Sequence, residues 1–218
     1  MPSISTIISF LAVASCAIAA PTAQSPDVDT AGPLDSTPVS FAKASYADGT
    51  YKKTVLKHHN VHRANHSAPA LSWGSNMATW AAEVAAGCVW SHNTSVGTKG
   101  YGQNIAAGTP ATGISDVITD EFYNGEVNNF LPSYYGEANP DMSNFENWGH
   151  FSQVVWKGTQ KVGCATQDCT KMGGIKGLPS DFPPYFTVCN YYPPGNMGGE
   201  YGDNIKKPLG KATVNGNY

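Results

Sequence analysis

The stretch Trp148-Gly149-His150-Phe151-Ser152-Gln153-Val154-Val155-Trp156 places a histidine beside an apolar face and then continues into strand-like sequence. Phe151, Val154 and Val155 recur at helical spacing, which predicts one or two turns of helix that pack inward through these side chains. The same packing leaves His150 free to point across a cleft. A histidine in that position needs a partner from elsewhere in the chain.

His92 is the candidate partner of His150. It ends the segment Cys88-Val89-Trp90-Ser91-His92, just past a helical pattern, where a loop can bring it opposite His150. The alternative is that both histidines are polar residues that cap helix ends. Histidine titrates near neutral pH and suits either role, so spacing alone does not decide between them.

The composition bounds the class of protein. With 218 residues, of which 41% are hydrophobic and 13% charged, the chain predicts one globular domain of moderate size with an extracellular type of surface. A net charge of -3 and the absence of a Lys/Arg run exclude an electrostatic footprint for nucleic acid and offer acidic membranes little attraction. Neutral partners are therefore expected.

Two N-terminal segments precede the predicted domain. Residues 1–20 are predicted to be a secretory signal peptide, because the apolar run from Ile4 ends in small residues that fit an A-x-A cleavage site. This run is shorter than the roughly 20 residues that a bilayer requires, so no stable membrane anchor is expected. Residues 21–45 contain four prolines among Ser, Thr, Asp and Ala, which predicts a disordered linker. The sequence thus predicts a secreted, extracellular protein.

Removal of the signal peptide leaves four cysteines, Cys88, Cys164, Cys169 and Cys189. An even number in an oxidising compartment predicts two disulfides, but four cysteines permit three pairings and the sequence does not choose among them. A zinc site made from these cysteines is the alternative. It is discounted because no C-x-x-C pair is present.

Apolar periodicity predicts three further helices and a pair of strands. The helices are expected over residues 46–64, 76–87 behind a Ser75 cap, and 114–128, and the strands over 161–166 and 184–191 with a hairpin between them. In the first helix, His58, His62 and His66 form a stripe with i, i+4 spacing. Such a stripe is able to bind a metal, although it is more often a solvated helix face.

Four segments together resemble a known family. They are His59-Asn60-Val61-His62-Arg63, Tyr101-Gly102-Gln103-Asn104-Ile105, the Gly149 to Trp156 stretch, and Cys189-Asn190-Tyr191-Tyr192-Pro193-Pro194-Gly195-Asn196. In this order they are similar to the signature blocks of the CAP superfamily, which comprises the cysteine-rich secretory proteins, antigen 5 and the pathogenesis-related class 1 proteins. The resemblance covers residues 46–205 as one CAP domain and leaves residues 206–218 as a C-terminal tail.

The resemblance implies an α+β fold. This fold is a three-layer α-β-α sandwich, with helices on both faces of a small, largely antiparallel sheet. The resemblance also implies disulfides that join Cys88 to Cys169 and Cys164 to Cys189. In the family, the histidine and asparagine that match His59 and Asn60 are mainly scaffold groups, hydrogen-bonded inside the fold.

The family has a cleft tetrad of two histidines and two carboxylates. The matching positions are His92, Gln103, Glu126 and His150, with Glu121 as the alternative to Glu126. Gln103 stands where the family has a glutamate, so the expected affinity for a divalent ion is lower than for the family pattern. His92 and His150 are still expected to bind zinc weakly, with waters in the remaining tetrahedral positions.

Catalysis is not the expected activity, and no catalytic residue is assigned. The chain has no G-x-S-x-G and no H-E-x-x-H motif, while Ser91 and Ser152 lie near the two cleft histidines without an identifiable third member. A metal-dependent hydrolase or protease that uses the histidine cleft is kept as the alternative function.

The resemblance to fungal and plant members implies a secreted pathogenesis-related protein that binds a sterol, a fatty acid or another small lipid, with a role in host–microbe interaction. The loop that contains Phe130, Tyr134, Tyr135 and Phe145 is predicted to bind the lipid by burial of apolar area. The alternative is that these rings cover one edge of the core. A signalling role ranks last, because residues 193–196 resemble the start of a peptide released from plant members but the following sequence departs from it.

Asn65 and Asn93 each begin an N-glycosylation sequon in an expected surface loop. At least one of them is predicted to carry sugar. A glycan on Asn93 would crowd the mouth of the cleft, because Asn93 adjoins His92. The protein is expected to be a monomer.

Overall fold

The computed structural model of the chain describes residues 49–212 and 214–216. The predicted signal peptide and linker, the expected start of the first helix at residue 46, and the last residues of the C-terminal tail lie outside the described residues. Within the described part, no helix combines the length and the apolar character that a membrane crossing requires.

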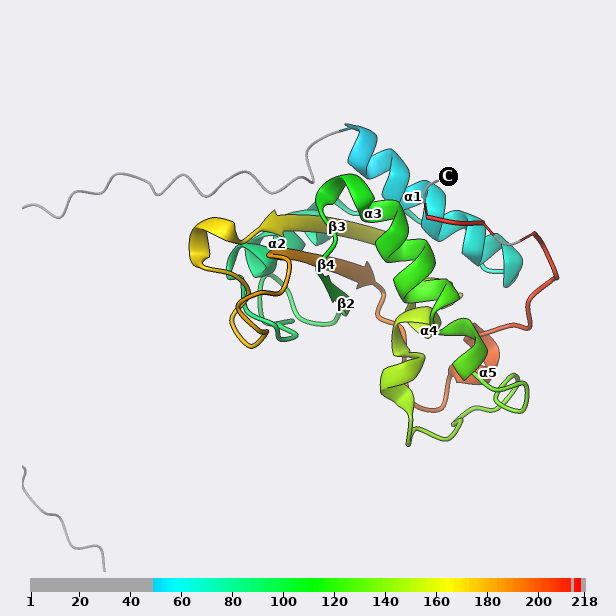
Figure 1. Cartoon of the computed structure of the whole chain (residues 1–218). Coiled ribbons are helices and arrows are strands. Elements are labelled where there is room, and N and C mark those ends of the chain that lie inside the picture. The colour runs from blue at the N-terminus through cyan, green and yellow to red at the C-terminus, as the bar shows by residue number, and fades with distance from the viewer. Residues whose placement is uncertain (1–48, 213, 217–218) are drawn as a thin grey trace, which may run out of the picture. The chain divides into compact units, whose positions relative to one another are not determined.

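A four-stranded sheet forms the middle layer of the described fold (Figure 1). Its strands are β1 (Ser72–Trp73), β2 (Gly102–Ala107), β3 (Lys161–Asp168) and β4 (Tyr185–Tyr192), in the spatial order β1-β3-β4-β2. β1 pairs with β3 in parallel, and the other two pairings are antiparallel. The predicted strand pair is confirmed as β3 and β4, whereas β1 and β2 were not predicted.

Alternation along the central strands gives the sheet two apolar faces. In β3, Val162 and Cys164 belong to one hydrophobic core, while Ala165 belongs to the other. In β4, Cys189 lies in the first core and Val188 in the second. Successive side chains of a strand point to opposite faces, so each face of this sheet has to be covered by helices.

Helices cover both faces (Figure 1). On one face lies α2 (Ser75–Ala86), and on the other lie α1 (Gly49–Asn65), α3 (Ile114–Asp116) and α4 (Gly149–Val155). This arrangement confirms the predicted α-β-α sandwich. α2 approaches the sheet closely because β3 carries Gly163, where a Cβ atom would lie 2.2 Å from the backbone nitrogen of Ala78. The remaining helical turns are η1 (Ala111–Gly113), η3 (Val127–Asn129), η4 (Phe145–Asn147), η5 (Thr170–Met172) and α5 (Tyr201–Asn204).

Two predictions about helices are wrong in detail. Ser75 is the first residue of α2 and not its cap; the N-cap is Gly74, which offers no side-chain hydrogen bond. The helix predicted over 114–128 is α-helical only as far as Asp116 and continues as the π-helix η2 (Val117–Asn124). At its end the N–H of Gly125 donates to the carbonyl of Asp120 at 2.9 Å, a bond across five residues. Apolar spacing near 3.6 residues does not distinguish such a wide turn from an α-helix.

Both predicted disulfides are present. Cys88 is bonded to Cys169 and joins the end of α2 to the segment after β3. Cys164 is bonded to Cys189, which lies directly opposite it in the β3–β4 register with a Cα–Cα distance of 4.0 Å. The family resemblance therefore chose correctly among the pairings that the sequence left open.

The histidine stripe of α1 is buried, so its interpretation as a solvated helix face is wrong. His58, His62 and His66 are at most 3% exposed because η2 packs over this face of the helix. The Thr119 hydroxyl lies 2.8 Å from His58 Nδ1 and 2.9 Å from His62 Nε2. His66 Nε2 lies 2.9 Å from the hydroxyl of Tyr123. The stripe thus joins α1 to η2 through hydrogen bonds.

The neighbouring polar residues of α1 have the scaffold role that the resemblance implies. His59 is fully buried, with Nε2 2.9 Å from the hydroxyl of Tyr191. Asn60 accepts from the backbone N–H of Leu71 at 2.7 Å. Arg63 is also fully buried, and its guanidinium donates to four backbone carbonyls, those of Pro69, Val154, Trp156 and Thr159. These bonds fix the position at which α4 ends and β3 approaches.

Candidate functional site

Glu126 and His150 form a close acid–imidazole pair. Glu126 Oε1 lies 2.6 Å from His150 Nδ1, and its other oxygen accepts from the backbone N–H of Phe151 at 2.9 Å. The pair is positioned by two turns, since Glu126 precedes η3 and His150 lies in the first turn of α4. Phe122 stacks on the imidazole with ring centroids 4.9 Å apart. The carboxylate therefore holds the ring with Nε2 as the nitrogen that remains for a ligand.

Glu121, the alternative to Glu126, has a different hydrogen-bond partner. Its Oε1 accepts from the Thr109 hydroxyl at 2.8 Å. Partial burial raises the pKa of Glu121, and the hydrogen bond from Thr109 opposes this effect. The geometry thus assigns the histidine-bonding role to Glu126, while Glu121 supplies a second acidic group nearby.

His92 and Gln103 form a separate pair. The side-chain oxygen of Gln103 lies 3.1 Å from His92 Nδ1 and accepts from the backbone N–H of Asn93 at 3.0 Å. The amide NH₂ of Gln103 donates to the backbone carbonyl of Asn93 at 3.1 Å and to Asn190 Oδ1 at 3.0 Å. A glutamate is unable to make the last two bonds because an ionised carboxylate only accepts. Gln103 therefore fastens the His92 loop to the sheet.

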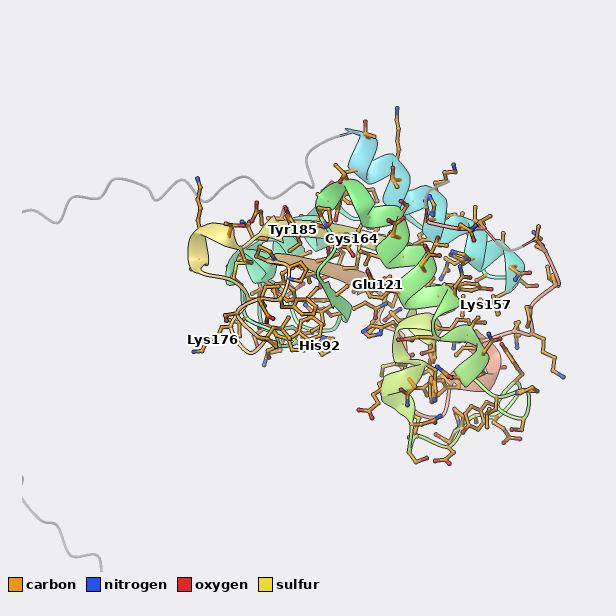
Figure 2. The ribbon with its side chains drawn as sticks, in the orientation of Figure 1. His92, Glu121, Lys157, Cys164, Lys176 and Tyr185 are labelled. Carbon is orange, nitrogen blue, oxygen red and sulfur yellow. A yellow bond between two sulfur atoms is a disulfide. The ribbon has the colours of Figure 1, made fainter. Side chains whose placement is uncertain are left out.

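A cavity of about 400 Å³ lies between β2, η2 and the loop that joins β3 to β4. Its acidic and imidazole groups are Glu121, Glu126 and His150, whereas neither His92 nor Gln103 lines it. The apolar wall includes Trp90, Ile105, Ala107, Phe122, Leu178 and Phe182. Figure 2 shows Glu121 on η2 and His92 on the loop after α2. The four predicted cleft residues thus form two pairs, and only one pair faces this cavity.

The donor set does not fit an assembled metal site. Among the described residues, no three or more His, Cys, Asp or Glu side chains are grouped so that they could hold a metal ion. Two imidazoles in different pairs and one carboxylate already bonded to His150 leave no ready tetrahedral set. Zinc binding by His92 and His150 therefore stays a prediction.

The predicted lipid loop is mostly packed against the protein itself. Phe130 is 2% exposed, and its ring contacts those of Tyr134, Tyr135 and Trp148 at centroid distances of 5.4, 4.9 and 5.2 Å. Tyr134, Tyr135 and Phe145 are half-buried and pack on the larger core. This packing favours the alternative that the rings cover one edge of the core.

The serines beside the histidines have structural partners. Ser152 is fully buried, and its hydroxyl lies 2.6 Å from Asn196 Oδ1 and 3.0 Å from the carbonyl of Gly149. The hydroxyl of Ser91 donates to the carbonyl of His92. Neither serine is bonded to an imidazole, so neither has the arrangement of an activated nucleophile.

The two sequons differ in accessibility. Asn93 is exposed, and its Oδ1 accepts from the backbone N–H of Ser95. Asn65 is half-buried, donates to the hydroxyl of Tyr123 at 3.1 Å and accepts from the backbone of Lys211 at 3.0 Å. A glycan therefore fits Asn93 better than Asn65.

Three apolar residues of the cavity were missed by sequence reasoning. Trp90 lies two residues before His92, and Leu178 and Phe182 belong to the loop between β3 and β4. The sequence predicted only a hairpin between the two strands in this region and no contact with a cavity. A phenylalanine just before Pro183-Pro184 was the signal available, since a large exposed ring in a loop is uncommon without a contact.

A comparison of sequences identifies the family. The profile described as "CAP: Cysteine-rich secretory protein family" matches residues 56–191. This chain belongs to that family. The matched range contains the two disulfides and the Glu126–His150 pair, so the predicted family assignment is confirmed.

Fungal relatives share much of the chain. A probable pathogenesis-related protein of Arthroderma benhamiae is 46% identical over 164 residues, which cover 75% of this chain and 51% of that protein. Protein PRY2 of Saccharomyces cerevisiae is 35% identical over 156 residues, which cover 71% of this chain and 41% of that protein. The chain therefore spans about half the length of the curated relatives it matches.

Solved structures share the fold. The crystal structure of NaASP2 with Zn²⁺ matches with a TM-score of 0.58 and 21% identity, covering 75% of this chain and 88% of that chain. The structure of Schistosoma mansoni venom allergen-like protein 4 matches with a TM-score of 0.51 and 21% identity, covering 74% and 98% of the two chains. At these identities the likeness shows the fold alone.

Proposed function

We propose that this protein is a secreted, non-catalytic binder of a small lipid, held in the cavity that Trp90, Phe182 and the Glu126–His150 pair line. The observation that carries the proposal is the apolar wall of this cavity. Trp90 and Phe182 are each 38% exposed, so both rings have area left to bury against a ligand. A cavity of about 400 Å³ lies within the range of small-molecule sites.

The acidic side chains that line the cavity favour a sterol over a fatty acid. Glu121 and Glu126 both line it, and two carboxyl groups repel a ligand that carries a carboxylate of its own. A sterol hydroxyl is neutral and is able to donate to a carboxylate or to accept from His150. Burial of the sterol rings against Trp90 and Phe182 then contributes about 25 cal/mol for each Å² of apolar area.

The hydrolase alternative rests on the Glu126–His150 pair, which resembles an oriented general base. The serines next to the cleft histidines are engaged elsewhere, and the described residues lack an assembled metal group. A nucleophile for the reaction is therefore missing from the described contacts. Binding is the simpler function for a cavity with a mainly apolar wall.

Three properties support a secreted role in host–microbe contact. The chain carries two disulfides, which persist in oxidising compartments. The family to which it belongs is described as secretory, and the Arthroderma benhamiae relative is named pathogenesis-related. The identity of the lipid and the role in host–microbe contact are both parts of this proposal.

The test measures binding of radiolabelled cholesterol, ergosterol and palmitate to the secreted protein, with a peptidase assay in parallel. Phe182→Asp places a charge in the cavity and should abolish sterol binding, while Leu209→Asp changes an exposed apolar residue outside the cavity and serves as the control. Sterol binding should be insensitive to EDTA and to salt, because it rests on apolar burial.

A double variant, Tyr134→Asp with Phe145→Asp, tests the predicted loop as the rival site. Near-UV circular dichroism must show that each variant is folded, because both rings pack on the core. Loss of binding only in the folded loop variant would move the site to the loop. Parental sterol affinity in folded Phe182→Asp would remove the cavity from the mechanism, and peptidase activity that EDTA abolishes would favour the hydrolase.

A further inference from the structure

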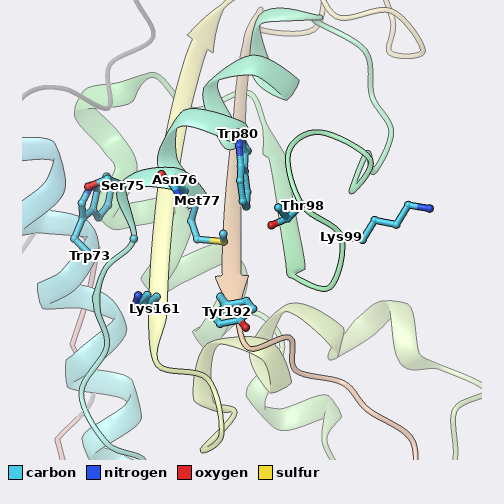
Figure 3. Close-up of a pocket in the computed structure, with 10 residues that line it drawn as sticks. Trp73, Ser75, Asn76, Met77, Trp80, Thr98, Lys99, Lys161 and Tyr192 are labelled. Carbon is cyan, nitrogen blue, oxygen red and sulfur yellow. The ribbon is translucent and has the colours of Figure 1, made fainter.

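A second and larger cavity, of about 660 Å³, lies at the start of α2 (Figure 3). Its walls come from five places in the chain: β1, the first turns of α2, the loop around Thr98, the first residue of β3 and the last residue of β4. It shares no lining residue with the cavity at Glu126 and His150. The two cavities therefore have independent side chains with which to bind a ligand.

Three aromatic rings from three elements line this cavity. They are Trp73 from β1, Trp80 from α2 and Tyr192 from β4. Trp73 and Trp80 are half-buried, and Tyr192 is 48% exposed. Figure 3 shows the Trp80 ring between Met77 and Thr98, with Tyr192 at the opposite end of the site. Exposed ring faces at separate points of one cavity suit a ligand with several flat, weakly polar faces.

Trp80 is held in place by its packing. Its ring stacks on Tyr101 at a centroid distance of 5.6 Å and an interplanar angle of 28°. Gly97 lies so close to the indole that a Cβ atom at this position would be 2.0 Å from Cε2 of the ring. Only a residue without a side chain allows this approach, and the positive φ of 73° at Gly97 also favours glycine. The indole is therefore fixed before any ligand binds.

The polar side chains at the cavity are neutral or cationic. Ser75, Asn76 and Thr98 supply hydroxyl and amide groups and Lys161 supplies an ammonium group, whereas the side chain of Lys99 extends away from the other lining residues (Figure 3). None of the lining residues is acidic. The ammonium group of Lys52 lies 5.9 Å from the centre of the Trp73 ring and adds a further positive charge beside the site. The combination favours a ligand that has many hydroxyl groups and a negative charge.

We propose that this cavity binds an acidic oligosaccharide, a chain of sugar rings that carries carboxylate groups. The C–H face of a sugar ring carries partial positive charge and stacks on the electron-rich face of an aromatic ring, here Trp80 and Tyr192. The sugar hydroxyls pair with Asn76 and Thr98, and a carboxylate binds the ammonium of Lys161. A lipid is disfavoured because the lining includes polar side chains, among them Asn76, Thr98 and Lys161, as well as the rings.

The test uses the full secreted chain after enzymatic removal of N-glycans, so that no glycan of its own competes for the site. Isothermal titration calorimetry with trigalacturonic acid and with neutral maltotriose compares two trisaccharides that differ in charge. The acidic trisaccharide should bind at least ten-fold more tightly, and its affinity should fall with added salt. Equal affinity for the two, or no binding of trigalacturonic acid at millimolar concentration, overturns the proposal.

Two variants test ring stacking and charge pairing separately. Tyr192→Ser should lower the affinity for trigalacturonic acid about ten-fold, and Lys161→Ala several-fold with a weaker dependence on salt. Lys176→Ala removes an exposed lysine outside this cavity and serves as the matched control. Unchanged affinity in both test variants would refute the site. Tighter binding of adenosine monophosphate than of trigalacturonic acid would identify a nucleotide site instead.

Discussion

We predict that the buried histidines of α1 make this fold sensitive to mild acid, and His62 allows the size of the effect to be worked out. Its imidazole is 3% exposed, contacts Thr119 and stacks on Tyr123 with ring centroids 3.8 Å apart. Burial, followed by the charges of His58 and His66, lowers the pKa of His62 from 6.5 to about 4, while the charge of Asp120 opposes the shift. The folded protein therefore resists protonation at this position.

The sign of the effect follows from the two protonation states. Above pH 6.5, His62 is neutral in the folded and the unfolded chain, so it adds no dependence on pH. Between pH 6.5 and about 4 only the unfolded chain takes up the proton, so stability is lost as the pH falls. At about 1.36 kcal/mol for each pH unit, lowering the pH to 5 costs about 2 kcal/mol through His62 alone.

The assay is urea unfolding of the oxidised protein at pH 7.5, 6.0 and 5.0, for the parent and for His62→Gln. Glutamine does not titrate and is long enough to keep a hydrogen bond to Thr119. Between pH 7.5 and 5.0 the variant should lose about 2 kcal/mol less than the parent. Both proteins keep a further loss through His59, whose pKa burial lowers to about 3, and this loss cancels in the comparison.

The same comparison of parent and His62→Gln also defines the result that would refute the prediction. Groups such as Glu121, whose raised pKa acts in the opposite direction, are present in both proteins and cancel in the difference. If the free energies of unfolding of parent and variant fall in parallel between pH 7.5 and 5.0, burial of His62 does not govern the acid sensitivity. Near-UV circular dichroism at pH 7.5 checks that the variant retains the native packing.

Three further predictions concern other parts of the chain. Arg63→Met should destabilise the protein by about 3 kcal/mol or more, since three buried carbonyls and one partly buried carbonyl lose their donor, whereas denaturation curves that match the parent would contradict this. Gln103→Glu should bind zinc several-fold more tightly in calorimetry, because the added negative charge favours the cation. The variant should also melt at a lower temperature, because a carboxylate is unable to donate the two hydrogen bonds that the Gln103 amide makes. Unchanged zinc affinity would exclude Gln103 from the zinc site. Asn93→Gln should remove the mass loss that glycosidase treatment causes, and Asn65→Gln should not; the reverse result would show that the buried contacts of Asn65 do not protect it.

The layers of the fold were predictable because their signals are local. β4 alternates side chains between the two cores, and this period appears directly in the sequence. β2 was missed because Gly102, Gln103 and Asn104 are poor strand formers, and their strand conformation comes from pairing with β4, far along the chain.

The candidate site was only partly predictable, for a related reason. Spacing in α1 places His58, His62 and His66 on one face, but it contains no information about which other segment covers that face. The pairing of Glu126 with His150 followed from the family resemblance, whereas the separation of His92 into a second pair depends on the path of its loop. The apolar wall formed by Trp90 and Phe182 joins two loops that no local pattern connects.

The two disulfides overlap along the chain, and this order has a consequence for cleavage by proteases. The first joins Cys88 to Cys169, and the second joins Cys164 to Cys189. Any single cut between Cys88 and Cys189 therefore leaves two pieces that are still joined by at least one disulfide. The exposed Gly173 and the half-buried Gly174 lie inside this interval, as do η2, α4 and both residues of the Glu126–His150 pair. A nicked molecule keeps its pieces together for as long as its cystines stay oxidised, and a gel reveals the nick only after reduction.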